Sequence, residues 1–146
     1  MDKTYDNDIE KLNSLLRGEL AAVETYTQCI EKMDASDTVV VAQLRTLARS
    51  HQHRADRLTM KVRELGGDPE TGSGAWGTFA KLVEGGAKLF GKAAAISALE
   101  EGEDHGKKEY DDLDDLTLTT KAFVQRELMP EQQRTHDVLN RLQHQM

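Results

Sequence analysis

The sequence predicts an all-α protein made of two antiparallel helical hairpins, joined by a long crossover that carries a short helix. The 146 residues include only two prolines and few aromatic residues. Many of the others are Ala, Leu, Glu, Lys and Gln, which favour helices. Apolar residues recur at steps of three and four, as on the buried face of an amphipathic helix. We expect one domain over residues 1–146, with hairpins at 4–66 and 92–144 and the crossover at 67–91.

The first hairpin is predicted from its apolar stripe and its stop signals. A helix over about residues 4–34 is marked by Ile9, Leu12, Leu16, Glu19, Val23, Tyr26, Ile30 and Met33. Turn and N-cap residues follow at 34–37, and a second helix is expected over 37–65. Gly66-Gly67-Asp68-Pro69 should end that helix.

The crossover and the second hairpin follow from the remaining pattern. Apolar residues at helical spacing from Trp76 to Phe90 predict the short helix of the crossover. A third long helix is expected over about 92–116, and a polar junction at 117–120 leads into the last helix, which should end near residue 143. Pro130 lies inside the last helix and should kink it, because proline lacks a backbone donor.

An internal repeat places carboxylates on the buried faces of the first and third helices. Glu19 precedes Tyr26 by seven residues, and Glu103 precedes Tyr110 by the same seven, at a constant offset of 84. Seven residues at about 100° each bring the glutamate and the tyrosine to the same helix face. Small residues near the glutamates should let the two helices approach closely: Gly18, Ala22, Gly102 and Gly106.

Histidines of the partner helices extend this pattern into a layer. In an antiparallel hairpin, residues equidistant from the turn lie at one level. Glu19 and His53 are centred on residue 36, and Glu103 and His136 are centred on the second junction. The residues predicted to share one layer of the bundle are therefore Glu19, His53, Glu103 and His136. The apolar stripe of the second helix favours His51 as the inward residue instead, and the level argument leaves this choice open.

These residues resemble the ferritin-like superfamily, whose bundle carries Glu on the first and third helices and Glu-x-x-His on the second and fourth. The chain offers Ser50-x-x-His53 and Gln133-x-x-His136 at the latter positions. The segments LGGDPE, GEDHGKKEY and Thr135-His136-Asp137, with the Trp76 crossover, resemble more narrowly a bacterial ferritin-like family of unknown function. The resemblance implies a ferritin-like four-helix bundle with a metal-ligating layer of Glu19, His53, Glu103 and His136, and it brings no established activity.

The missing carboxylates at Ser50 and Gln133 limit the metal that the layer could hold. Two divalent ions a few ångströms apart need bridging anions to offset their repulsion. We therefore expect no cofactor, or one Fe or Zn ion. Without a cation, Glu19 and Glu103 would repel each other, so we expect at least one of them to have a raised pKa.

Composition narrows the classes of function. A net charge of −7 argues against nucleic-acid binding, and no apolar run is long enough to cross a membrane. The acidic N-terminus is unlike a signal peptide. The single cysteine, Cys29, excludes an internal disulfide, so we expect a cytoplasmic protein.

Three classes of function remain, and the sequence leaves open whether the protein is an enzyme. The favoured hypothesis is a non-catalytic ferritin-like bundle with a stress-related or scaffold role and a degenerate metal layer. The alternative is a single-metal protein for storage, sensing or redox work. The third is a partner-binding module, in which the segment from Trp76 to Phe90 forms an exposed amphipathic surface or the face of a homodimer.

Overall fold

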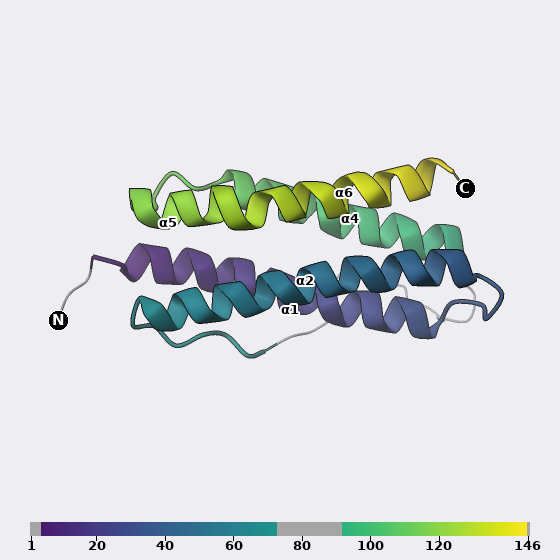
Figure 1. Cartoon of the computed structure of the whole chain (residues 1–146), viewed down its shortest axis with the longest axis horizontal. Coiled ribbons are helices and arrows are strands. Elements are labelled where there is room, and N and C mark those ends of the chain that lie inside the picture. The colour runs from purple at the N-terminus through teal and green to yellow at the C-terminus, as the bar shows by residue number, and fades with distance from the viewer. Residues whose placement is uncertain (1–3, 73–91, 146) are drawn as a thin grey trace.

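The computed structural model describes residues 4–72 and 92–145, and these residues form helices and no strand. The elements are α1 (Asp6–Glu31), α2 (Thr38–Glu64), α4 (Lys92–Asp111), α5 (Leu118–Phe123), the π-helical turn η2 (Val124–Leu128) and α6 (Met129–His144). The last three follow one another without a break, so the described chain forms four long helical segments lying side by side (Figure 1). The prediction of an all-α protein is confirmed.

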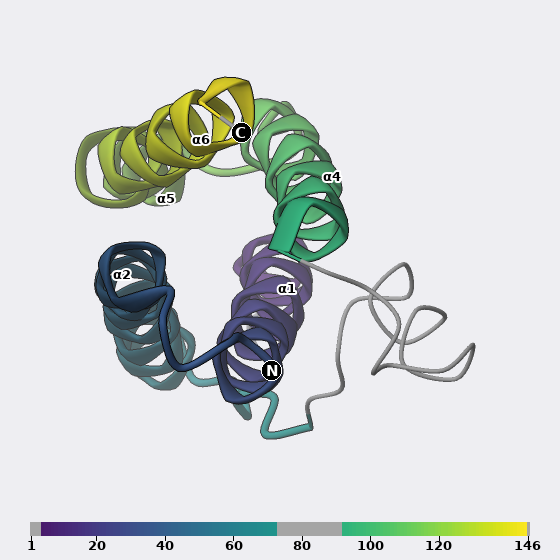
Figure 2. The same cartoon turned by 90° about the vertical axis from the view of Figure 1, so that its right-hand side faces the viewer.

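The helices are arranged as two hairpins packed against each other. α1 packs against α2, and α4 packs against α6; α1 also contacts α4, and α2 also contacts α6. Figure 2 shows this arrangement from one end, with each hairpin forming one side of the bundle. The predicted contact between the first and third long helices is therefore confirmed. The close approach expected at Gly18 and Gly106 is wrong, because a Cβ on either glycine would meet no described atom within 4 Å. The short helix and the dimer face predicted at residues 76–90 lie outside the described residues.

The end of α2 lies where the glycine pair predicts it. Gly66 has a φ of 88°, and its N–H donates to the carbonyl of Arg63 at 3.0 Å, while the N–H of Gly67 donates to that of Val62 at 2.9 Å. This pair of bonds is a Schellman motif, which favours glycine at the residue with positive φ. A Cβ on Gly67 would lie 2.6 Å from Ile9 Cγ2, so this glycine also permits α1 to pack closely.

The third long helix is shorter than predicted. α4 ends at Asp111, whereas the apolar pattern predicts a helix to about residue 116. Aspartate is a weak helix former, and negative charge is unfavourable at the C-terminal end of the helix dipole. The aspartates of 111–115 therefore end the helix, while Leu113 and Leu116 remain buried in the connection to α5.

A buried carboxylate fixes the start of α5. Asp8, on α1, is fully buried and accepts bonds from the Thr117 N–H at 3.0 Å and the Thr117 hydroxyl at 2.6 Å. The helix begins at Leu118, directly after this residue. The connection between the helices therefore lies at residues 112–117 and not at the predicted 117–120, because α4 ends early and Thr117 is tied to α1.

The last helical segment is irregular close to Pro130, where the sequence predicts a kink. Proline cannot donate to a carbonyl in the preceding turn, and its ring crowds the carbonyl four residues earlier. The wider turn η2 ends at Leu128, and Pro130 lies in the first turn of α6. The π-helical turn moves the hydrogen-bond pattern past the proline and changes the rotational position of α6 relative to α5.

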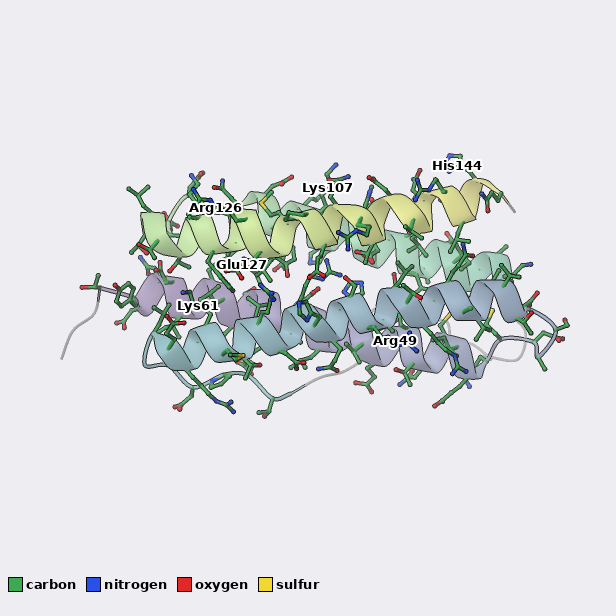
Figure 3. The ribbon with its side chains drawn as sticks, viewed as in Figure 1. Arg49, Lys61, Lys107, Arg126, Glu127 and His144 are labelled. Carbon is green, nitrogen blue, oxygen red and sulfur yellow. The ribbon has the colours of Figure 1, made fainter. Side chains whose placement is uncertain are left out.

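The core has two apolar clusters separated by a buried polar layer. One cluster joins α1, α2, α4 and α6 and contains Tyr26, Leu44, Leu99 and Leu139. The other lies toward the opposite end of the bundle and contains Leu12, Leu58 and Leu128. Charged side chains such as Arg49, Arg126 and His144 are exposed on the outside of the bundle (Figure 3). None of the described helices combines the length and apolar character needed to span a bilayer.

Candidate functional site

The two glutamates of the repeat meet in the polar layer, and His51 of α2 lies between them. Glu19 is 5% exposed and Glu103 is 2% exposed. His51 Nδ1 is 3.1 Å from Glu19 Oε1, and His51 Nε2 is 2.8 Å from Glu103 Oε2. The imidazole thus bridges carboxylates from α1 and α4, and the two glutamates share one environment as predicted.

Arg54 completes the layer with a second cationic side chain. It is fully buried, and its Nε lies 2.6 Å from Glu19 Oε2. Its Nη2 donates to the Thr135 hydroxyl at 3.2 Å. Sequence reasoning missed Arg54, although its position three residues after His51 places both on one face of α2.

The tyrosines of the repeat pair crosswise with the glutamates. The Tyr26 hydroxyl, on α1, donates to Glu103 Oε2 of α4 at 2.8 Å, and the Tyr110 phenol of α4 faces Glu19 of α1. Burial, with the nearby Glu103 charge, raises the pKa of Tyr26 well above its ordinary value. Burial and the Glu19 charge do the same to the pKa of Tyr110. Both phenols therefore stay protonated, and the Tyr26 hydroxyl acts as a hydrogen-bond donor.

The last helix contributes Gln132 and Thr135. The Thr135 hydroxyl donates to Glu103 Oε1 at 2.9 Å. Gln132, one turn earlier, is 4% exposed, and its Nε2 finds no hydrogen-bond acceptor among the residues that the structure describes. The layer thus receives side chains from all four helical segments.

The charges of the layer compensate one another. Burial by itself would raise the pKa of Glu103, but the His51 charge and hydrogen bond, followed by Arg54 and Tyr26, lower that pKa to about 2. Burial by itself would lower the pKa of His51, but Glu103 and Glu19 together raise it. The expectation of a raised pKa is therefore wrong for Glu103, because cationic side chains of α2 lie beside the glutamates.

His51 has a bonding partner in either protonation state. The Nε2 atom of His51 lies at hydrogen-bond distance from Glu103 and can donate to it whether the ring is protonated or neutral. The protonated ring can donate from Nδ1 to Glu19, while the neutral ring can accept there from Arg54 Nη2 at 2.7 Å. A raised pKa keeps the doubly donating form to higher pH than in a free histidine.

Residues 7–114 match the family described as Domain of unknown function (DUF2383). The chain belongs to this family. No curated protein and no solved structure matches the chain. The part that matches DUF2383 carries Glu19, His51, Arg54 and Glu103, so three of the four helices that form the layer lie within the family match.

Two of the four predicted layer residues, His53 and His136, lie outside the buried polar layer. His53 is exposed, and its Nε2 accepts a bond from Arg57 at 2.9 Å. His136 Nε2 lies 2.6 Å from Asp104 near the surface. Equidistance from a turn sets the level of a residue but not its rotational position. His53 lies about 200° around the helix from the inward His51, and Thr135 takes the inward position next to His136.

The predicted four-residue metal set is therefore not brought together. In residues 4–72 and 92–145, no group of three or more His, Cys, Asp or Glu side chains is placed to hold a metal ion. The inward side chains of this family member also include Arg54, a permanent cation with no lone pair to offer a metal. The donor set of the layer does not fit a di-metal centre.

Proposed function

We propose that this protein is a non-catalytic bundle of the ferritin-like type, in which Arg54 and His51 supply the positive charge that metal ions supply in the metal-binding members of that superfamily. The observation that carries the proposal is the buried Arg54 guanidinium, 2.6 Å from Glu19 at the centre of the bundle. We assign the protein a scaffold or stress-related role in the cytoplasm. In such a role the functional part of the protein is the stable outer surface of its helices.

The spacing of the inward residues supports the ferritin-like assignment. Ferritin-like metal sites use Glu on two helices and Glu-x-x-His on the other two. The layer here has Glu19 and Glu103 on α1 and α4, with His51-x-x-Arg54 on α2 and Gln132-x-x-Thr135 on α6. In this alignment both bridging carboxylates and both histidine ligands are replaced, and the two replacements on α2, His51 and Arg54, supply positive charge.

The electrostatics of the layer support a metal-free protein. Arginine stays protonated throughout the accessible pH range, so a divalent ion beside Arg54 would be repelled in a medium of low dielectric constant. Both ring nitrogens of His51 already lie against carboxylates. A metal ion could use Glu19, His51 and Glu103 only after the ring turned and Arg54 moved away.

Metal analysis of protein purified without a histidine tag tests the proposal. After loading with ferrous iron or zinc and removal of free ions, we expect the wild type to retain far less than one ion per chain. Arg54→Ala, which removes the competing cation, should bind zinc more tightly than the wild type. Retention of one ion per chain by the wild type would favour the single-metal alternative. Two ions with an oxygen-dependent absorption band would overturn the proposal.

A further inference from the structure

A cavity of about 340 Å³ lies between α1 and α4, with the polar layer at its floor. Gly18, Gly102 and Gly106 form part of its walls. A Cβ at Gly18 or Gly106 would meet no atom within 4 Å in the described part of the chain. Ligand sites commonly measure about 300–1,000 Å³, and a cavity of roughly 150 Å³ already holds benzene. The space therefore suits a small organic molecule.

The floor of the cavity contains a buried donor that needs an acceptor. The Gln132 side chain is 4% exposed and lines the cavity. Its Nε2 has no acceptor within residues 4–72 and 92–145, although buried polar groups in native proteins are nearly always hydrogen-bonded. The Glu19 and Glu103 carboxylates line the same floor and can accept a bond. A ligand group that both donates and accepts would satisfy this floor.

The charges around the cavity favour an uncharged ligand. At the floor, Glu19 is paired with Arg54 and His51, and Glu103 with His51. At the rim, Arg17 is paired with Glu70 at 2.9 Å, and the Glu109 carboxylate lies 3.2 Å from His105 Nε2 and accepts a bond from the Ser14 hydroxyl at 3.3 Å. A charged ligand would lose its hydration without gaining a free counter-ion.

We propose that this cavity binds a small uncharged phenol. Gln132 Nε2 is itself buried, so the amide must turn toward the cavity; the ligand hydroxyl then accepts a bond from Gln132 Nε2 and donates one to a carboxylate of the layer. The apolar ring occupies the space left by Gly18 and Gly106 and packs against Leu15 and Tyr110, which also line the cavity. The inference rests on the shape and polarity of the cavity and is independent of the proposed absence of a metal.

Titration of the full-length, ¹⁵N-labelled protein with p-cresol, followed by NMR, tests this site. The backbone amides of Gly18, Gly102 and Gly106 should shift together along one saturating curve. Toluene, which lacks the hydroxyl, and p-toluate, which is charged, should each bind more weakly than p-cresol. Gln132→Leu should weaken p-cresol binding roughly fivefold by removing one hydrogen bond.

The second part of the test uses a variant whose side chain fills the cavity. Gly106→Leu places a side chain in the space and should abolish the shifts, while Thr46→Leu on the exposed face of α2 should leave them unchanged. Thermal melts report whether each variant is folded. Three results would overturn the proposal: no shift at these glycines up to the solubility limit of p-cresol, unchanged binding in both cavity variants, or toluene binding as tightly as p-cresol.

Discussion

Replacing Arg54 with methionine should destabilise the protein by about 3–5 kcal/mol, the usual cost of removing one member of a buried ion pair. Methionine keeps much of the side-chain volume but removes the charge 2.6 Å from Glu19 Oε2 and the donor to Thr135. Glu19, at 5% exposure, is then held by His51 without its closest cation. At about 2–4 °C per kcal/mol for a chain of this size, the Tm should fall by about 6–20 °C.

Urea and thermal unfolding followed by far-UV circular dichroism at neutral pH measure this loss. Arg57→Met is the matched control, because Arg57 lies on the same helix and pairs with the exposed Glu127. Exposed ion pairs contribute less than about 1 kcal/mol. A loss in Arg54→Met no larger than in Arg57→Met would refute the role of Arg54 as the compensating charge.

A double variant separates lost charge from lost packing. Glu19→Gln/Arg54→Met removes both partners, so no buried carboxylate is left without its guanidinium. It should be more stable than Arg54→Met alone, with a coupling energy of about 1–3 kcal/mol. If the two single effects simply add, the pair is not coupled and the destabilisation comes from packing.

Four further outcomes follow from the described contacts. Glu103 has a folded pKa of about 2, against an ordinary value of 4.5. Its ionisation should therefore contribute about 3 kcal/mol to the free energy of unfolding above pH 4.5, and this contribution should be lost as pH falls toward 2. Unfolding titrations should show this loss in the wild type but not in Glu103→Gln. The raised pKa of His51 has the opposite sign, so its contribution is complete below pH 6.5 and fades as pH rises through the folded pKa, a trend that His51→Gln should remove. Gly106→Ala should raise stability by about 1 kcal/mol in urea unfolding, because its Cβ meets no described atom within 4 Å. Asp8→Asn should cost about 1–3 kcal/mol in the same assay, since Asp8 accepts both bonds from Thr117.

The helices and the glutamate pair could be predicted because both depend on periodicity. Steps of three and four mark the buried face of α1, and the offset of 84 places Glu19 and Glu103 at matching positions. The ends of α2 and α4 illustrate the limit. Gly66 carries an explicit stop signal, whereas the end of α4 depends on how the aspartates after Tyr110 compete with the apolar pattern that continues to Leu116.

The identity of the layer residues could be predicted only in part. Turn midpoints give the level of a histidine, but the choice between His51 and His53 depends on rotation about the helix axis, and the apolar stripe pointed correctly to His51. On the last helix, the π-helical turn before Met129 alters the rotational relation that a regular helix would have. Arg54 was missed because arginine is rarely fully buried, and nothing local in the sequence shows that a glutamate of α1 pairs with it.

NMR of the Arg54 side chain tests most directly whether a buried guanidinium, and not a metal ion, compensates the core carboxylates. The Nε–H of Arg54 should give a resolved signal at neutral pH that exchanges slowly with water. That signal should stay in place when one equivalent of zinc is added. An Arg54 Nε–H that exchanges as fast as that of Arg57, or that shifts in step with stoichiometric zinc, would contradict this role.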